Sequence, residues 1–422
     1  MKKTEPFIGW IVLILAVILG GTLLKTDMLF FRLLVGLGFG YTLSRAFTGF
    51  AGSVNRAFRT GSAKLMRTMM FMFFITALLT TSFLLKAEDI TAYGLWINPI
   101  NLGLLLGAML FGFGMSFSSC CATGTMTDLV TGLPRALITL IFFCIGVFVG
   151  FPAQKSSLAT AAWLTSETGE LFSKGVFFPD LFKWDGMGGY IGALLLTALL
   201  GSIVVFLSYR FEKKRKAANR YTGVVSEIDQ DKHESLEISQ YKLLSASTYQ
   251  RYFVKPWTLK QGAVILSVLF TLLMGVTKAG WGASTPYGLW FGKVLMLFGV
   301  SAADLAAFTK MPEAGFTTPF FEHGVSVQNF GIIVGTLIFM LTAGLFSKVF
   351  TSELKIHAIE IVLFAIGGLT MGYGTRLANG CNVGALYSPI AAFSLSGWIF
   401  LVFMIIGGII GNQVFKAVLK EK

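Results

Sequence analysis

Apolar segments of about 20 residues recur along nearly the whole chain, and they constrain the fold more than any other feature. A helix needs about 20 apolar residues to cross a bilayer. The candidate segments are 7–24, 29–50, 68–85, 98–117, 133–152, 188–209, 258–277, 289–308, 329–347, 357–378 and 391–415. Because Gly or small polar residues interrupt several of them, about nine full crossings with additional half-helices would fit equally well. The sequence therefore predicts an all-α membrane protein, a polytopic helical bundle.

The composition supports this interpretation and excludes several classes of protein. Only 13% of the 422 residues are charged and 55% are hydrophobic, whereas soluble domains carry about 25% charged residues. A soluble enzyme, a disordered protein and a nucleic-acid-binding domain are thereby excluded, and no nucleic-acid partner is expected. The net charge of +13 is expected mostly in loops, where Lys and Arg set topology, with a smaller part available to attract an anion. The apolar run after Met1-Lys2-Lys3 has no small-residue cleavage site, which predicts an uncleaved first helix that starts in the cytoplasm.

The long polar stretch at 210–256 divides the chain. It contains ten Lys or Arg against six Asp or Glu, and the positive-inside rule places it in the cytoplasm. We expect an N-terminal transmembrane half at 1–209, a cytoplasmic charged linker at 210–256 and a C-terminal transmembrane half at 257–422. A solvated linker is the favoured interpretation of 210–256, and a regulatory or partner-docking role is the alternative.

The two hydrophobic halves share one motif, G-x-G-x(6)-C-x-x-G. GAMLFGFGMSFSSCCATG at 107–124 and GGLTMGYGTRLANGCNVG at 367–384 align without a gap at an offset of 260 residues. The offset superposes Gly107 on Gly367, Gly112 on Gly372, Gly114 on Gly374, Cys121 on Cys381, and Gly124 on Gly384. A matched Cys in both copies predicts a duplication, with two pseudo-symmetric halves and a site where they meet.

Each copy of the motif begins as an apolar helix and ends in small polar residues. Irregular backbone at membrane depth is tolerated only inside the protein or beside a cavity. We therefore expect re-entrant half-helices, with each Cys at a broken helix that points toward the middle. A thiol is soft and a weak donor, which suits a sulfur-bearing anion, and half-helix N-termini add partial positive charge. The candidate substrate-binding residues are Cys121, Cys381, Cys120, Arg376, Asn379, Asn382, Gly124 and Gly384.

Alternative interpretations of these residues stay open at this point. Cys144 lies within IFFCIGVF and is expected to be an apolar filler. Cys120 aligns with Gly380 and not with a Cys, and Arg376 can equally be a topology anchor. Polar residues also interrupt the stretches 45–58 and 310–331, as functional groups or as loops. The pair Asp128 and Arg135 is expected to form an ion pair in a loop.

The motif pair resembles the repeated signature of the YeeE/YedE family of bacterial inner-membrane sulfur transporters. The second copy, with R-L-A-x-G-C-x-x-G, is the more specific, and the resemblance covers roughly 30–152 and 258–415. It implies a multi-pass protein of the inner (cytoplasmic) membrane that takes up thiosulfate or a related small sulfur-containing anion, with Cys121 and Cys381 as the substrate-contacting thiols. The family also has a Cys in an early repeat, where this chain has Thr48 and Gly49. Another branch is associated with selenium metabolism, so a selenium compound is an alternative substrate.

The remaining expectations concern chemistry and partners. No zinc-site spacing, haem, flavin or iron–sulfur signature and no phosphate-binding loop is present, so we expect no metal and no cofactor. No general base stands beside either motif, which favours a transporter over an enzyme. The alternative is a membrane thiol enzyme that moves sulfur as a persulfide. The expected partners are the anion, the lipid bilayer and, by family analogy alone, a cytoplasmic small thiol-carrier sulfurtransferase.

Overall fold

The computed structural model describes residues 4–231, 245–352 and 354–419, and the regular secondary structure of these residues is helical throughout. Among them, nine helical segments are long and apolar enough to cross a membrane. These are Thr4–Leu23 (α1), Lys64–Leu84 (α4), Leu102–Thr131 (α5 and α6), Leu133–Gln154 (α7), Tyr190–Ala217 (α10), Leu259–Thr277 (α13), Gly324–Thr342 (α17), Ala358–Ala391 (α19 to α20) and Leu395–Leu419 (α21). The predicted polytopic helical bundle is confirmed.

Other α-helices connect or flank these segments. Within the nine, α5 is Leu102–Ser118, α6 is Ala122–Thr131, α19 is Ala358–Leu377, and the π-helix η7 (Asn382–Tyr387) leads into α20 (Ser388–Ala391). The others are α2 (Asp27–Ala46), α3 (Gly52–Thr60), α8 (Ser157–Thr160), α9 (Glu167–Glu170), α11 (Val225–Asp231), α12 (Ala246–Tyr249), α14 (Thr285–Leu297), α15 (Ala302–Thr309), α16 (Ala314–Thr317) and α18 (Phe346–Ser352).

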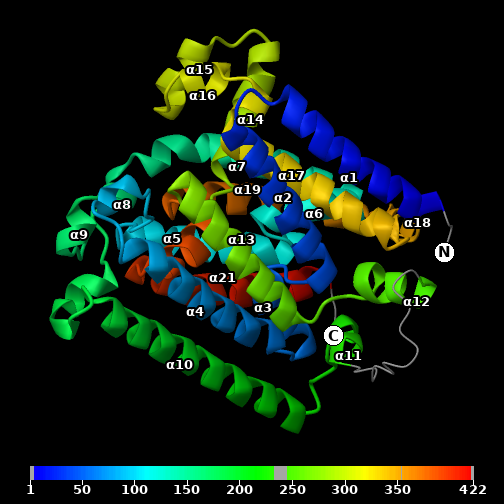
Figure 1. Ribbon diagram of the computed structural model, residues 1–422, viewed down its shortest axis with the longest axis horizontal. Coiled ribbons are helices and arrows are strands. Elements are labelled where there is room, and N and C mark those ends of the chain that lie inside the picture. The colour runs from blue at the N-terminus through cyan, green and yellow to red at the C-terminus, as the bar shows by residue number, and fades with distance from the viewer. Residues whose placement is uncertain (1–3, 232–244, 353, 420–422) are drawn as a thin grey trace.

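Two candidate crossings from the sequence, 29–50 and 289–308, are not among the nine, and the helix in the first of them, α2, ends at Ala46. The segment 289–308 is not a single helix, because α14 ends at Leu297 and α15 begins at Ala302. Gly299 between them has a positive φ of 92°, a conformation that glycine adopts without steric cost. Figure 1 shows α14 running across the other long helices and leading to α15 and α16, which project from the bundle.

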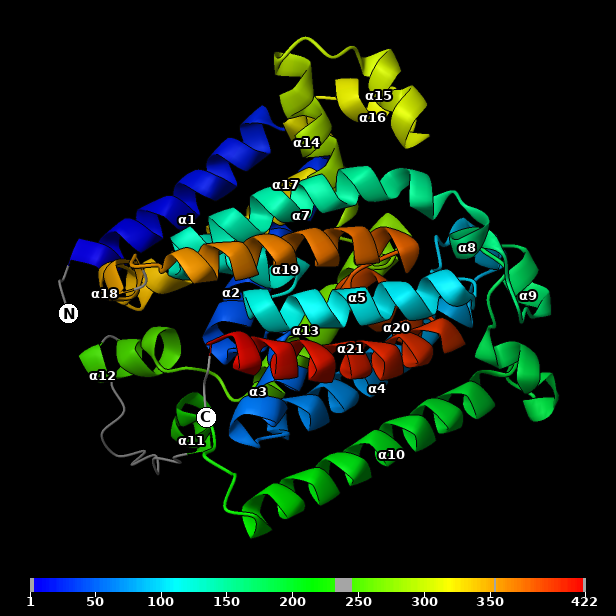
Figure 2. The ribbon, with the colours of Figure 1, turned by 180° about the vertical axis from the view of Figure 1, so that it is seen from behind.

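The helices on either side of the linker interleave. The closest pairs are α7 with α19, α2 with α17, and α5 with α21, and α5 also packs on α19. The motif glycines make these contacts close: a Cβ at Gly112 would overlap the carbonyl oxygen of Met404, and one at Gly372 would overlap that of Phe143. Small residues at such positions let membrane helices approach backbone to backbone, so the repeated glycines bring α5 and α19 to the centre of the bundle (Figure 2).

Four of the helix breaks in the described residues, each followed by a shorter helix, resemble one another. The breaks after α2, α5, α17 and α19 each contain a residue with positive φ: Phe47 (53°), Ser119 (58°), Gly344 (65°) and Asn379 (57°). At three of them an N–H group reaches back to the carbonyl oxygen five residues earlier: Thr48 to Leu43 (3.2 Å), Leu345 to Met340 (2.9 Å) and Gly380 to Thr375 (2.7 Å). This is the hydrogen bond of a Schellman helix end. The re-entrant character of the short helices stays a prediction.

The two ends of the bundle differ in what they carry. Figure 2 shows the beginning of α1 with α11, α12 and α18 at one end, and α8 with α9 at the other. The basic residues Lys214, Arg215 and Lys216 end α10 at the first of these ends. The positive-inside rule predicts that this end faces the cytoplasm.

Candidate functional site

Cys121 and Cys381 hold equivalent positions in the backbone. Each is the N-cap residue of the short helix that follows a break, Cys121 for α6 and Cys381 for η7. The carbonyl oxygen of Cys121 accepts from the Thr125 N–H at 2.7 Å, and that of Cys381 accepts from the Ala385 N–H at 2.6 Å. Both residues are at most 1% exposed and belong to one core cluster. The structure thus places both cysteines at helix breaks in the interior.

The two motifs approach each other through their flanking residues. The Asn382 Nδ2 donates to the Met115 Sδ at 3.3 Å, which joins the second motif to α5. The Tyr287 hydroxyl donates to the Ala122 carbonyl oxygen at 2.5 Å. Cys121 and Cys381 also belong to the same buried core cluster. The matched residues therefore share one central region, although they are 260 residues apart in the sequence.

A cavity of about 280 Å³ opens beside the first motif. Cys120, Cys121 and Gly124 line it together with residues of α3 and of the break before it. The Cys120 Sγ lies 3.3 Å from the Thr125 hydroxyl, and the Cys121 Sγ lies 3.3 Å from the Thr123 hydroxyl. Since a water molecule takes about 30 Å³, the cavity is large enough for a small anion and several waters. Gly49, at the early repeat, lines the same cavity.

Two arginines of α3 give this cavity its positive charge. Arg56 and Arg59 both line it. The Arg59 guanidinium donates to the Ser119 hydroxyl (3.2 Å), the Ser116 carbonyl oxygen (2.8 Å) and the Asn412 Oδ1 (3.1 Å). Asp128, which also lines the cavity, is held by Arg135 at 2.9 Å. The predicted ion pair is confirmed, but it joins α6 to α7 and does not lie in a loop. Arg59 was not among the site residues predicted from the sequence. In the sequence it is marked only as a basic residue that closely follows Asn55 and Arg56.

Arg376 lies outside that cavity, near the opposite end of the bundle. It is 2% exposed. Its guanidinium donates only to neutral groups: Ser284 Oγ (2.6 Å), Thr375 Oγ1 (3.1 Å), Thr285 Oγ1 (3.2 Å) and Gln154 Oε1 (3.4 Å). None of the ion pairs found in the described residues includes Arg376. A buried cation whose hydrogen-bond partners among the described residues are all neutral is costly, so this position suits a visiting anion.

Two of the other predicted site residues, Asn379 and Gly384, make contacts that hold the end of α19 and the turn after it in place. Asn379 accepts from the Gln154 Nε2 at 3.0 Å and donates to the Ala159 carbonyl oxygen at 3.4 Å, so it fixes the end of α19 against α7 and α8. Gly384 packs under the Trp96 ring, where a Cβ would overlap the ring. Cys381, Arg376, Asn379, Asn382 and Gly384 do not line the cavity beside Cys121. Cys144 is a buried residue of α7, and all four thiols are free.

Comparison with known proteins gives the family. The chain matches the family model described as sulphur transport over residues 45–410. It belongs to the sulphur transport family. The match covers both copies of the motif and confirms the resemblance seen in the sequence.

Curated relatives fall into two groups. The chain is 29% identical to the "Probable transporter YedE" of Salmonella typhimurium over 169 residues, 39% of each chain. It is 25% identical to the "Thiosulfate transporter TsuA" of Spirochaeta thermophila over 321 residues, 74% of this chain and 77% of the relative. The TsuA of Escherichia coli is 24% identical over 72% of each chain. The alignment with the YedE relatives spans about two fifths of their length.

Proposed function

We propose that this protein carries thiosulfate or a related small sulfur-containing anion into the cell, along a central path that passes Cys121 and Cys381. Membership of the sulphur transport family supports the class of substrate. The proposed path is supported by the positions of the two matched thiols, Cys121 and Cys381. Each starts a short helix in the core, and each half of the bundle adds a buried or cavity-lining arginine near one of them.

Three groups of contacts form this path. Arg376, held by the Ser284 and Thr285 hydroxyls, receives the anion at the outer end. The S–H groups of Cys381 and Cys121 then donate to it at the centre, together with the N–H groups at the starts of η7 and α6. Arg59 and Arg56 receive it in the cavity at the inner end. Conduction requires that each contact bind weakly enough to release, and neutral thiols meet this condition without a covalent step.

The setting of the protein is part of the same proposal. We place it as a multi-pass protein in the bacterial inner membrane, with the linker side toward the cytoplasm. A small cytoplasmic thiol-carrier sulfurtransferase would receive the anion on that side.

Uptake by the purified protein in proteoliposomes tests the substrate class. Labelled thiosulfate is offered outside the vesicles, with unlabelled thiosulfate, sulfate, sulfite, selenite and selenate as competitors. We expect saturable thiosulfate uptake that only chemically close anions inhibit. Uptake of sulfate in preference to thiosulfate would contradict the proposal. If a selenium oxyanion competes best, the substrate is a selenium compound and not thiosulfate. A persulfide found on Cys121 or Cys381 by mass spectrometry would favour covalent sulfur transfer.

A further inference from the structure

The first part of the linker is docked on the inner end of the bundle. Glu227 of α11 is 4% exposed and Gln230 is 6% exposed, although a solvated linker is the favoured interpretation of the sequence. The Gln230 Nε2 donates to the Ala46 carbonyl oxygen at 3.2 Å. Just before α11, the Thr222 N–H donates to the Thr60 carbonyl oxygen at the end of α3, at 2.9 Å. The linker is therefore held against the helix that carries Arg56 and Arg59.

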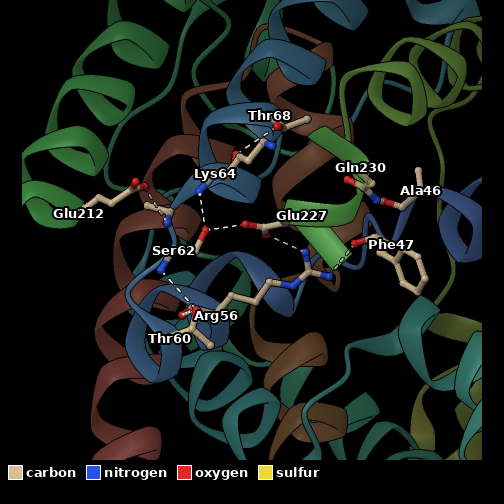
Figure 3. Close-up of polar contacts among 11 residues, drawn as sticks. Ala46, Phe47, Arg56, Thr60, Ser62, Lys64, Thr68, Glu212, Glu227 and Gln230 are labelled. Atoms are coloured by element: carbon tan, nitrogen blue, oxygen red, sulfur yellow. Dashed lines mark hydrogen bonds and ion pairs between the residues drawn. The ribbon is translucent and has the colours of Figure 1, made fainter. Parts of the chain in front are cut away.

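The Glu227 carboxylate binds a residue of the cavity wall. Its Oε1 accepts from the Arg56 Nη1 at 3.0 Å, and its Oε2 accepts from the Ser62 hydroxyl at 2.6 Å. Figure 3 shows Glu227 reaching from α11 between these two side chains. Arg56 also donates to the Phe47 carbonyl oxygen at 2.7 Å, so the break after α2 fixes the position of its guanidinium. Arg56 thus faces the Cys121 cavity and also holds a carboxylate.

A small oxyanion presents the same chemistry as this carboxylate. Both offer two oxygens to a guanidinium and a hydroxyl, and charge-assisted hydrogen bonds of this kind are the strong ones. We propose that Arg56, which lines the cavity, and Ser62, which does not, form an oxyanion-binding station beside it, and that the Glu227 carboxylate occupies this station as a tethered competitor. The proposal rests on the proposed function only for the identity of the transported anion. An anion that binds at Arg56 displaces Glu227, and α11 loosens because its carboxylate has lost its partner.

Glu212 provides a matched control. It is also a poorly exposed carboxylate at this end of the bundle, and it pairs with Arg67 at 2.9 Å and with Lys216 at 2.8 Å. None of these three residues lines the Cys121 cavity. Glu212 also accepts from the Ala63 N–H at 3.4 Å, but none of its contacts is to Arg56 or Ser62, so Glu212→Gln removes ion pairs at this end of the bundle and leaves the side-chain partners of the station in place.

Anion binding to the full-length purified protein tests the proposal. Labelled thiosulfate is titrated into wild type, Glu227→Gln, Glu212→Gln and the double variant Glu227→Gln/Arg56→Gln. We expect Glu227→Gln to lower the half-saturating concentration about tenfold, which corresponds to about 1.4 kcal/mol. Glu212→Gln should match wild type, and the double variant should lose the gain. An unchanged affinity in Glu227→Gln, or a gain that persists without Arg56, overturns the proposal.

Hydrogen exchange of the unmodified protein gives a second readout that does not depend on a variant that folds. Thiosulfate, and separately sulfate, should speed amide exchange in residues 225–231 and leave α10 unchanged. Exchange in 225–231 that no anion alters overturns the station, even where uptake is normal. Anion-dependent exchange without thiosulfate uptake would contradict the proposed function and leave the station standing.

Discussion

Replacing Arg376 by Met is expected to weaken anion binding strongly and to leave the fold intact. In the structure, the Arg376 guanidinium donates four hydrogen bonds, all to neutral groups. Burying a guanidinium costs several kcal/mol, and four hydrogen bonds from a charged group return about 1.5–3 kcal/mol each. These contributions are opposite in sign and of similar size, so a Met of similar length should change the free energy of unfolding little.

The effect on the substrate is larger, because the lost charge has no replacement at this end of the path. A unit charge about 4 Å from a guanidinium gains about 4 kcal/mol at an effective dielectric constant of 20. After desolvation, a hydrogen bond to a charged group contributes about 1.5–3 kcal/mol. The half-saturating thiosulfate concentration should therefore rise between about tenfold and about 150-fold. Arg376→Lys keeps the charge but not the planar fork, and it should fall between wild type and Arg376→Met.

Uptake across a range of thiosulfate concentrations, with melting temperatures of the same preparations, decides the matter. The expected result is a raised half-saturating concentration at an unchanged melting temperature. A wild-type half-saturating concentration in Arg376→Met would refute the reasoning. A large fall in melting temperature with normal uptake would show that Arg376 is a structural anchor.

Two further predictions concern stability. Gly112→Val should lower the free energy of unfolding by about 3 kcal/mol or more, because the new side chain meets the Met404 backbone. Gly49→Ala has open space around it and should melt like wild type. Equal melting temperatures for the two variants would contradict the packing described. Burial, with the positive charges of Lys293 and Arg32, lowers the pKa of His323, whose Nδ1 accepts from the Ser326 N–H at the start of α17 (3.2 Å). Because the folded pKa lies below the unfolded one, stability should fall as the pH drops below about 6.5. His323→Asn keeps a capping oxygen without the titration, so its melting temperature should depend less on pH, and an equal slope would contradict the assignment.

The sequence predicts the parts of the fold that depend on local composition. The length and apolarity of each segment predict a bundle with about nine crossings, and the glycines and small polar residues predict helix breaks at both cysteines. The prediction of a crossing at 289–308 was wrong, because the apolar residues on both sides of Gly299 give no sign of the turn there. The break after α2 falls in the stretch 45–58, for which a loop was one of two interpretations. The break after α17 lies inside the predicted crossing 329–347 and was not expected, since it carries no Cys.

The candidate site was only partly predictable, because its contacts join segments far apart in the chain. Ser284 lies 92 residues from Arg376, and Glu227 lies 171 residues from Arg56. No periodicity or motif links such pairs. The start of α14 beside α19 brings Ser284 to Arg376, and α11 against α3 brings Glu227 to Arg56. Residues of α3 and of the break before it complete the cavity that Cys121 lines and Cys381 does not, although the two motifs are alike in sequence.

Thiosulfate uptake by single Cys variants tests the central claim most directly. Wild type, Cys121→Ser, Cys381→Ser and the control Cys144→Ser are compared at equal amounts of folded protein. We expect uptake to fall at least about tenfold in Cys121→Ser and in Cys381→Ser, because the hydroxyl is a harder group than the thiol, and to stay at the wild-type rate in Cys144→Ser. Wild-type uptake in both Cys121→Ser and Cys381→Ser would contradict the account.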